Sequence, residues 1–203
     1  MVGIIPGIVA FIGAHPAWAN LVIAITAFGE SFAFLSLLFP GTAILIAAGA
    51  LCSMGVLNPV TAALAGIVGA VSGDSFSFWL GQKFGPRIAN IWPFTTRPQW
   101  LTRGDRFFAQ YGGASVFIGR FFGPLRAIVP LTAGMLHMPT AQFYIANVLS
   151  AVVWAPTLIL FGMFVGRTLS NSKDIETRLI LVALAIACVV ILARWARTRS
   201  RRL

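Results

Sequence analysis

The sequence predicts an all-α membrane protein, built as an inverted repeat of a re-entrant hairpin plus a transmembrane helix, with an additional C-terminal transmembrane helix. The first observation is composition. Of 203 residues, 58% are hydrophobic and 10% charged, whereas a soluble domain is about 45–50% apolar and about 25% charged. The second is that long apolar runs alternate with runs too short to cross a bilayer. The third is that proline–glycine breaks recur beside the short runs.

The first copy of the repeat is predicted over about residues 16–85. An apolar run over 18–38 contains Glu30 and stops at Pro40. The next run, 43–56, has 14 residues, and a helix of that length is only about 21 Å long, against a hydrocarbon core of about 30 Å. We therefore expect the second run to be one arm of a re-entrant hairpin.

The span that completes this copy is predicted over 60–80, with Asp74 inside it and its end at Gly85. Residues 86–112 differ in character, because arginines alternate there with tryptophan and phenylalanine. This composition is typical of a basic segment that lies at the membrane surface.

The second copy is predicted over about 113–166. Two short apolar arms, 114–122 and 126–138, flank a break, and a full span over 141–165 follows. A further transmembrane helix with a basic tail is predicted over 175–203. The residues expected to break the hairpins are Pro40, Gly123, Pro124 and Pro130.

Matched landmarks indicate that the two copies are related. The pairs Pro40/Pro124, Pro59/Pro139, Gly81/Gly162 and Gly85/Gly166 are offset by 84, 80, 81 and 81 residues. The last two pairs form a Gly-x-x-x-Gly motif at the end of each span. Such motifs pack helices within one chain or between chains, so a homo-oligomer is an open alternative.

The arginines predict the topology. The formal net charge is +10, and the chain ends in a cluster of arginines directly after the last apolar run. We expect this tail to be cytoplasmic and to face anionic lipid, not nucleic acid. The basic segment 86–112 then also lies inside, and the two hairpins enter from opposite faces. Opposed hairpins are the architecture of alternating-access transporters.

Two arginines lie in the apolar stretch around the second break, where a charge costs about 2.5–3.5 kcal/mol on insertion scales. The helices that begin after each break also have unsatisfied N–H groups at their starts. Together these groups predict an anion site, most naturally for a lipid phosphate. The predicted ligands are Arg120, Arg126, Gly41, Thr42 and Leu125.

Other interpretations of the charges stay open. Arg120 is also a candidate for a structural ion pair with Glu30 or Asp74, and both arginines are long enough to snorkel to the surface. Glu30 is either a protonatable switch or a permanently ionised partner of an arginine. Asp74 is expected to cap or line the same cavity, and Asn147 is expected to serve packing or local hydrogen bonding.

Enzyme and cofactor signatures are absent from the sequence. Both cysteines lie in apolar runs, which argues against a disulfide or metal site. Neither histidine has the neighbours of a phosphatase nucleophile, and no Walker loop occurs. We expect no enzyme activity, no cofactor and no metal, and any uphill transport would have to use an ion gradient.

At these residues the sequence resembles the DedA family, also called the SNARE-associated Golgi protein family. The resemblance covers about residues 15–166. The segments that carry it are Phe28-Gly29-Glu30-Ser31, Phe39-Pro40-Gly41-Thr42, Gly73-Asp74 and Gly119-Arg120-Phe121-Phe122-Gly123-Pro124-Leu125-Arg126 with Pro130 and Ala133-Gly134.

The resemblance implies a multi-pass protein of the bacterial inner membrane that translocates undecaprenyl phosphate or another phospholipid, with links to envelope integrity and the proton-motive force. It places the functional acid at Glu30 and the functional arginines at Arg120 and Arg126. Several members have a second acid where this chain has Thr42.

The sequence therefore predicts a lipid flippase or scramblase. Two alternatives are a proton-coupled transporter of small molecules or cations and a membrane assembly factor that transports nothing.

Overall fold

The computed structural model describes residues 12–33, 35–36, 41–88, 99, 102, 106, 108, 110–121 and 123–171. Within these residues the regular secondary structure is entirely helical. The predictions for Pro40, for much of the basic segment 86–112 and for the C-terminal helix over 175–203 lie outside the described residues.

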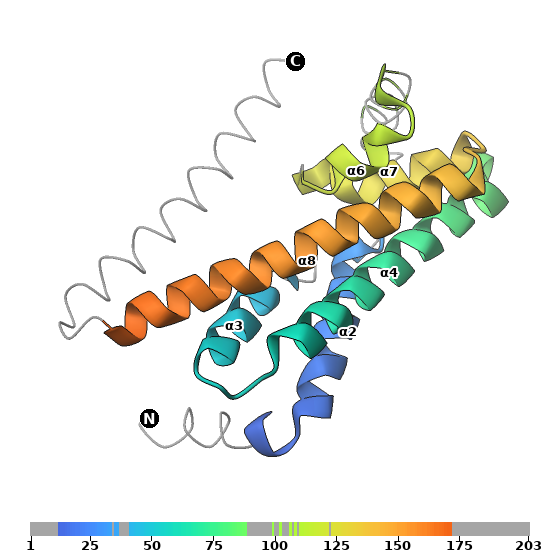
Figure 1. Cartoon of the computed structure of the whole chain (residues 1–203). Helices are drawn as coiled ribbons and strands as arrows, with labels where there is room; N and C mark the ends of the chain where they lie inside the picture. Colours follow the sequence, from blue (N-terminus) through green and yellow to red (C-terminus); the bar gives the residue numbers. More distant parts are fainter. Residues whose placement is uncertain are drawn as a thin grey trace.

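Six helices make up the described part: α2 (Pro16–Ser31), α3 (Gly41–Ser53), α4 (Pro59–Ile88), α6 (Ala114–Gly119), α7 (Gly123–Met135) and α8 (Thr140–Asn171). The two longest, α4 and α8, run beside each other through the molecule (Figure 1). The short helix α3 packs on α8, while α2 and α7 pack on α4.

Among the described residues, two helices are long and apolar enough to cross a membrane, namely Pro59–Gly85 within α4 and Thr140–Thr168 within α8. These correspond to the two full spans predicted at 60–80 and 141–165. The described part is therefore all-α with two candidate membrane-spanning helices, as predicted.

A proline lies at the start of each long helix, as predicted, inside α4 and directly before α8. Pro59 is the first residue of α4, where its missing N–H has no consequence. The side chain of Asn58 caps this end, because its Oδ1 accepts a hydrogen bond of 2.8 Å from the Val60 N–H. Thr140 begins α8 directly after Pro139.

Pro130 does not break its hairpin, which corrects the prediction. It lies inside α7, which runs without interruption from Gly123 to Met135. A proline removes one backbone hydrogen bond, and a helix packed on a neighbour within the membrane tolerates that loss. Similarly, α4 continues past the predicted end at Gly85 to Ile88.

Glycines bring the short helices into direct contact with the long ones. On α7, a Cβ added to Gly134 would overlap the Phe78 carbonyl oxygen and crowd the Gly81 Cα of α4. On α3, a Cβ added to Gly49 would likewise overlap the Ile159 carbonyl oxygen of α8 and crowd its Gly162. The glycines at which both spans were predicted to close therefore pack helices within this chain.

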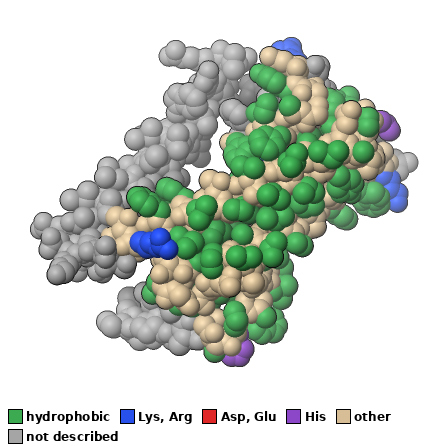
Figure 2. Space-filling view, viewed as in Figure 1, with side chains coloured by type: hydrophobic (Ala, Val, Ile, Leu, Met, Phe, Trp, Pro, Cys, Tyr) green, Lys and Arg blue, Asp and Glu red, His purple; other side chains and the backbone are tan. Residues whose placement is uncertain are grey.

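Apolar side chains lie outside the helix bundle as well as inside it. Within the core, the Phe78 and Phe143 rings stack with centroids 4.0 Å apart, while Val68, Ile145 and Phe164 are among the exposed large apolar residues of α4 and α8. Figure 2 shows one face, on which the described surface is rich in apolar side chains and the lysines and arginines lie near its edges. This surface suits a lipid environment.

Candidate functional site

Two ion pairs lie inside the bundle, near the middle of the spanning helices. Arg120 pairs with Asp74, and the Arg126 Nη1 lies 3.0 Å from the Glu30 Oε1. Arg120 and Arg126 are only 4% and 7% exposed, and Asp74 is 3% exposed. Asp74 is close to the midpoint of Pro59–Gly85. Charges so placed in a membrane protein mark a functional site by default.

The break between α6 and α7 directs both arginines to the same place. Arg120 follows the last residue of α6, and Arg126 lies near the start of α7. On one continuous helix the two side chains would be related by a rotation of about 240°, so they would point about 120° apart. Instead, both guanidinium groups lie over the ring of Trp154, with their Cζ atoms 5.9 Å and 4.2 Å from its centroid.

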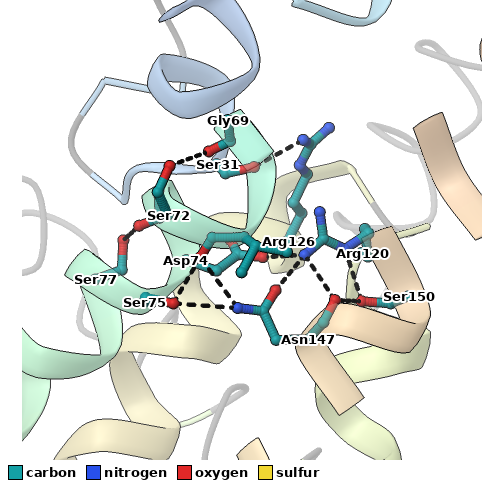
Figure 3. A network of polar contacts seen from close by, with 12 residues as sticks. Ser31, Gly69, Ser72, Asp74, Ser75, Ser77, Arg120, Arg126, Asn147 and Ser150 are labelled. Carbon is teal, nitrogen blue, oxygen red and sulfur yellow. Dashed lines mark hydrogen bonds and ion pairs between the residues drawn. The ribbon is translucent and has the colours of Figure 1, made fainter. Parts of the chain in front are cut away.

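Arg120 is held by both long helices (Figure 3). Its Nε donates to the Ser150 Oγ at 2.8 Å and its Nη2 donates to the Asn147 Oδ1 at 2.6 Å and to the Asp74 carboxylate. The Asn147 amide nitrogen in turn donates to the Val71 carbonyl of α4 at 3.2 Å. This guanidinium therefore joins α4 to α8.

Arg126 has different partners, and its polar ones belong to α2. Its Nη2 donates to the Ser31 Oγ at 3.0 Å (Figure 3), beside the ion pair with Glu30. The Glu30 side chain is 14% exposed, whereas the Asp74 side chain is 4% exposed. The Arg126 pair is therefore the more accessible of the two.

The start of α3 contacts the same acid. The Thr42 hydroxyl donates to the Glu30 Oε1 at 2.5 Å. Gly41 is buried, and a Cβ at this position would overlap the Glu30 Oε2. The predicted ligands Gly41 and Thr42 thus lie against the carboxylate, while Leu125 contributes a backbone position near the start of α7 and its side chain is not described.

Charge in this cluster balances, but hydrogen bonding does not. Two arginines face two carboxylates, so the formal charges cancel when all four groups are ionised. Four of their buried polar atoms nevertheless have no hydrogen-bond partner: Glu30 Oε2, Asp74 Oδ1, Arg120 Nη1 and Arg126 Nε. Buried polar atoms are normally satisfied, so this cluster has unused hydrogen-bonding capacity.

The structure distinguishes between the alternatives that the sequence left open. Asp74, not Glu30, pairs with Arg120, and Glu30 pairs with Arg126. Neither guanidinium reaches the surface, which corrects the snorkelling alternative.

Sequence reasoning gave too little weight to one face of α8. Asn147 was assigned to packing or local hydrogen bonding, but it accepts a hydrogen bond from the distant Arg120, and Ser150 and Trp154 were not considered. The three residues are spaced three and four apart, which places them on one helix face. An asparagine inside so apolar a span was the available signal.

Metal ligation finds no support in the described residues, where no group of three or more His, Cys, Asp or Glu side chains lies close enough to hold an ion.

Comparisons with known proteins agree on one family. The sequence model of the VTT domain matches residues 39–164. The inner membrane protein YabI of Escherichia coli is 33% identical over 180 residues, which cover 87% of this chain and 70% of that protein.

An uncharacterized membrane protein of Buchnera aphidicola is 32% identical over 81% of this chain and 64% of its own length. One of Mycobacterium tuberculosis is 32% identical over 76% of this chain and 72% of its own length. No solved structure gives a significant match.

Proposed function

This chain belongs to the VTT-domain family of membrane proteins, also called the DedA family, and from that premise we propose that it is a lipid transporter of the bacterial inner membrane. Its substrate is a lipid with a phosphate in the headgroup, such as undecaprenyl phosphate or a phospholipid. The phosphate docks at the buried arginines while the hydrocarbon tail stays in the bilayer. No enzyme step or cofactor is part of this proposal.

The observation that carries the proposal is the state of Arg126. Its guanidinium is buried, its Nε–H has no partner, and its ion pair with Glu30 is the more accessible one. A guanidinium presents its N–H groups as a planar fork that matches two phosphate oxygens. A phosphate would accept from the Nε and from the Nη2 on the same edge, which now donates to Ser31, and its charge would compete with that of Glu30 at the Nη1.

Competition between Glu30 and the headgroup gives the site a way to release its ligand. The formal charges of the cluster cancel, so an added phosphate has to displace a carboxylate from an arginine. Thr42 donates to the Glu30 Oε1 independently of the arginine, and it would hold the displaced carboxylate nearby. When the headgroup leaves, Glu30 returns to Arg126.

We further propose that the fold is an inverted repeat in which α2–α3 and α6–α7 are re-entrant hairpins from opposite faces. Reciprocal packing supports it. The Gly49 of α3 contacts the Gly162 of α8, and the Gly134 of α7 contacts the Gly81 of α4. The helices α3 and α7 therefore each pack on the long helix of the other copy. Rocking one copy against the other would open the arginine site alternately to each side.

Substitution of Arg126 tests this function. Purified protein is reconstituted into vesicles with fluorescent phosphatidic acid, and transfer between leaflets is followed by adding a membrane-impermeant quencher. Arg126→Ala should abolish transfer. Arg126→Lys should slow it about tenfold to a hundredfold, because a lost charge-assisted hydrogen bond is worth about 1.5–3 kcal/mol.

The matched control is Arg167→Ala, which removes an exposed arginine near the end of α8. It should transfer lipid as the wild type does. Full transfer by Arg126→Ala would refute the proposal. Loss of a pH-dependent cation flux in Glu30→Gln, with lipid transfer intact, would instead favour a proton-coupled small-molecule transporter. Capture of other membrane proteins without any flux would favour an assembly factor.

A further inference from the structure

We propose that Trp154 is a positioning residue for the headgroup site, because its indole face holds Arg126 in place when the ion pair between Arg126 and Glu30 breaks. This inference rests on the function proposed above. It assigns a role to a residue that contacts neither carboxylate of the cluster in any hydrogen bond or ion pair.

The geometry around the ring shows a close and dry contact. Trp154 is 5% exposed and lies near the midpoint of Thr140–Thr168. The Arg126 Cζ is 4.2 Å from its ring centroid, within the range of a strong cation–π contact. Tryptophan has the strongest cation–π face of the aromatic side chains, and the contact gains strength when water is excluded.

The other partners of Arg126 explain why such a contact is needed. Both Glu30 and Ser31 belong to α2. A phosphate that displaces Glu30 removes the ion pair and leaves only the hydrogen bond to Ser31 between Arg126 and α2. The indole belongs to α8 and has the Arg126 Cζ over its ring, whereas a phosphate would use the Nε–H, which has no partner. Ligand and tryptophan therefore do not compete.

Two consequences follow for the site. The guanidinium plane keeps its orientation while its anionic partner changes, so the Nε–H edge stays directed to the headgroup. The contact also links α7, which carries Arg126, to α8, which carries Trp154. The core role of Trp154 is real as well, since it packs beside Ala155 and Ile159, so a test has to separate packing from positioning.

Binding of a defined lipid makes that separation. Full-length protein is incubated with dioleoyl phosphatidic acid in detergent, and retained lipid is quantified by native mass spectrometry across a titration. Trp154→Phe keeps an aromatic face and should bind within about threefold of the wild type. Trp154→Leu removes the face and should weaken binding about tenfold to thirtyfold, as expected for a desolvated cation–π contact.

The matched control is Phe143→Leu, which removes a fully buried ring of the same helix that stacks on Phe78 outside the arginine cluster. It should lower thermal stability and leave phosphatidic acid affinity unchanged. In the vesicle assay, Trp154→Leu should raise the lipid fraction needed for half-maximal transfer more than it lowers the maximal rate.

Fluorescence gives a readout that does not need Trp154→Leu to fold. Adding phosphatidic acid to the wild type should shift its tryptophan emission, because a phosphate replaces the carboxylate beside the guanidinium that covers the ring. The shift should vanish in Trp154→Phe.

Equal binding by Trp154→Leu and wild type, equal weakening by Phe143→Leu, or no emission shift on binding would each overturn the role of Trp154. Failure of the wild type to retain phosphatidic acid would overturn the proposed function and this inference with it.

Discussion

Removing the charge of Asp74 should destabilise the protein strongly, because it leaves the buried guanidinium of Arg120 without its counter-ion. The substitution Asp74→Asn keeps the size of the side chain and one carbonyl acceptor. It removes the negative charge and turns the other oxygen into an NH2 donor. The affected pair is among the most buried in the described part, with side chains 2% and 4% exposed.

The magnitude follows from that burial. Deleting one partner of a buried ion pair costs about 3–5 kcal/mol, mainly because the remaining charge is uncompensated. Arg120 would keep its hydrogen bonds to Asn147 and Ser150. We therefore expect a loss at the lower end, about 3 kcal/mol, for Asp74→Asn, and a larger loss for Asp74→Ala.

Unfolding by SDS in mixed micelles, followed by circular dichroism, measures this free energy. The control is Ser72→Ala on the exposed side of the same helix, where the hydroxyl bonds only to local carbonyls. This control should change stability by less than about 0.5 kcal/mol. The double variant Asp74→Leu with Arg120→Met should be more stable than Asp74→Ala, since it buries no lone charge.

Two results would refute the reasoning. One is a loss in Asp74→Asn no larger than that in Ser72→Ala, which would mean that Arg120 does not depend on this carboxylate. The other is a double variant whose loss equals the sum of its two single losses, which would mean that the two groups are not coupled.

Two further substitutions test the packing and the acid. Gly134→Ala should lower the free energy of unfolding by about 1–3 kcal/mol, because its Cβ would overlap a carbonyl oxygen of α4. The control Gly113→Ala faces the flexible end of a methionine and should unfold at the wild-type temperature. Equal melting temperatures for the two variants would contradict the glycine contact. Thr42→Val should lower the free energy of SDS unfolding by about 1.5–3 kcal/mol, because it removes a hydroxyl that donates to Glu30. Thr42→Ser keeps the hydroxyl and should change this free energy little. Wild-type stability of Thr42→Val would show that the hydrogen bond contributes nothing.

Much of the fold could be predicted because the determining signals are local. A long apolar run has to become a helix in lipid, where every backbone group needs an internal partner, and α4 and α8 follow from that rule. Pro59 marks the start of a helix through its own missing N–H. Pro130 shows the limit of the same signal, since whether a proline ends a helix depends on what packs around it.

The site divides along the same line. Charged residues in apolar runs identified Arg120, Arg126, Glu30 and Asp74, because a charge inside an apolar run can be recognised without knowing its partner. The pairing of these charges does depend on the partner. Arg120 and Asp74 are 46 residues apart, and no spacing rule within one helix relates them.

The sequence alone therefore determined that this chain folds in a lipid bilayer, and which of its residues cost free energy to bury there. The tertiary structure alone decided which carboxylate meets which guanidinium and that an indole on α8 covers both. The physical reason is the rotation of each short helix about its own axis. Close glycine contacts set how each short helix is turned about its axis against a long one, and that turn selects the side chains that face each other.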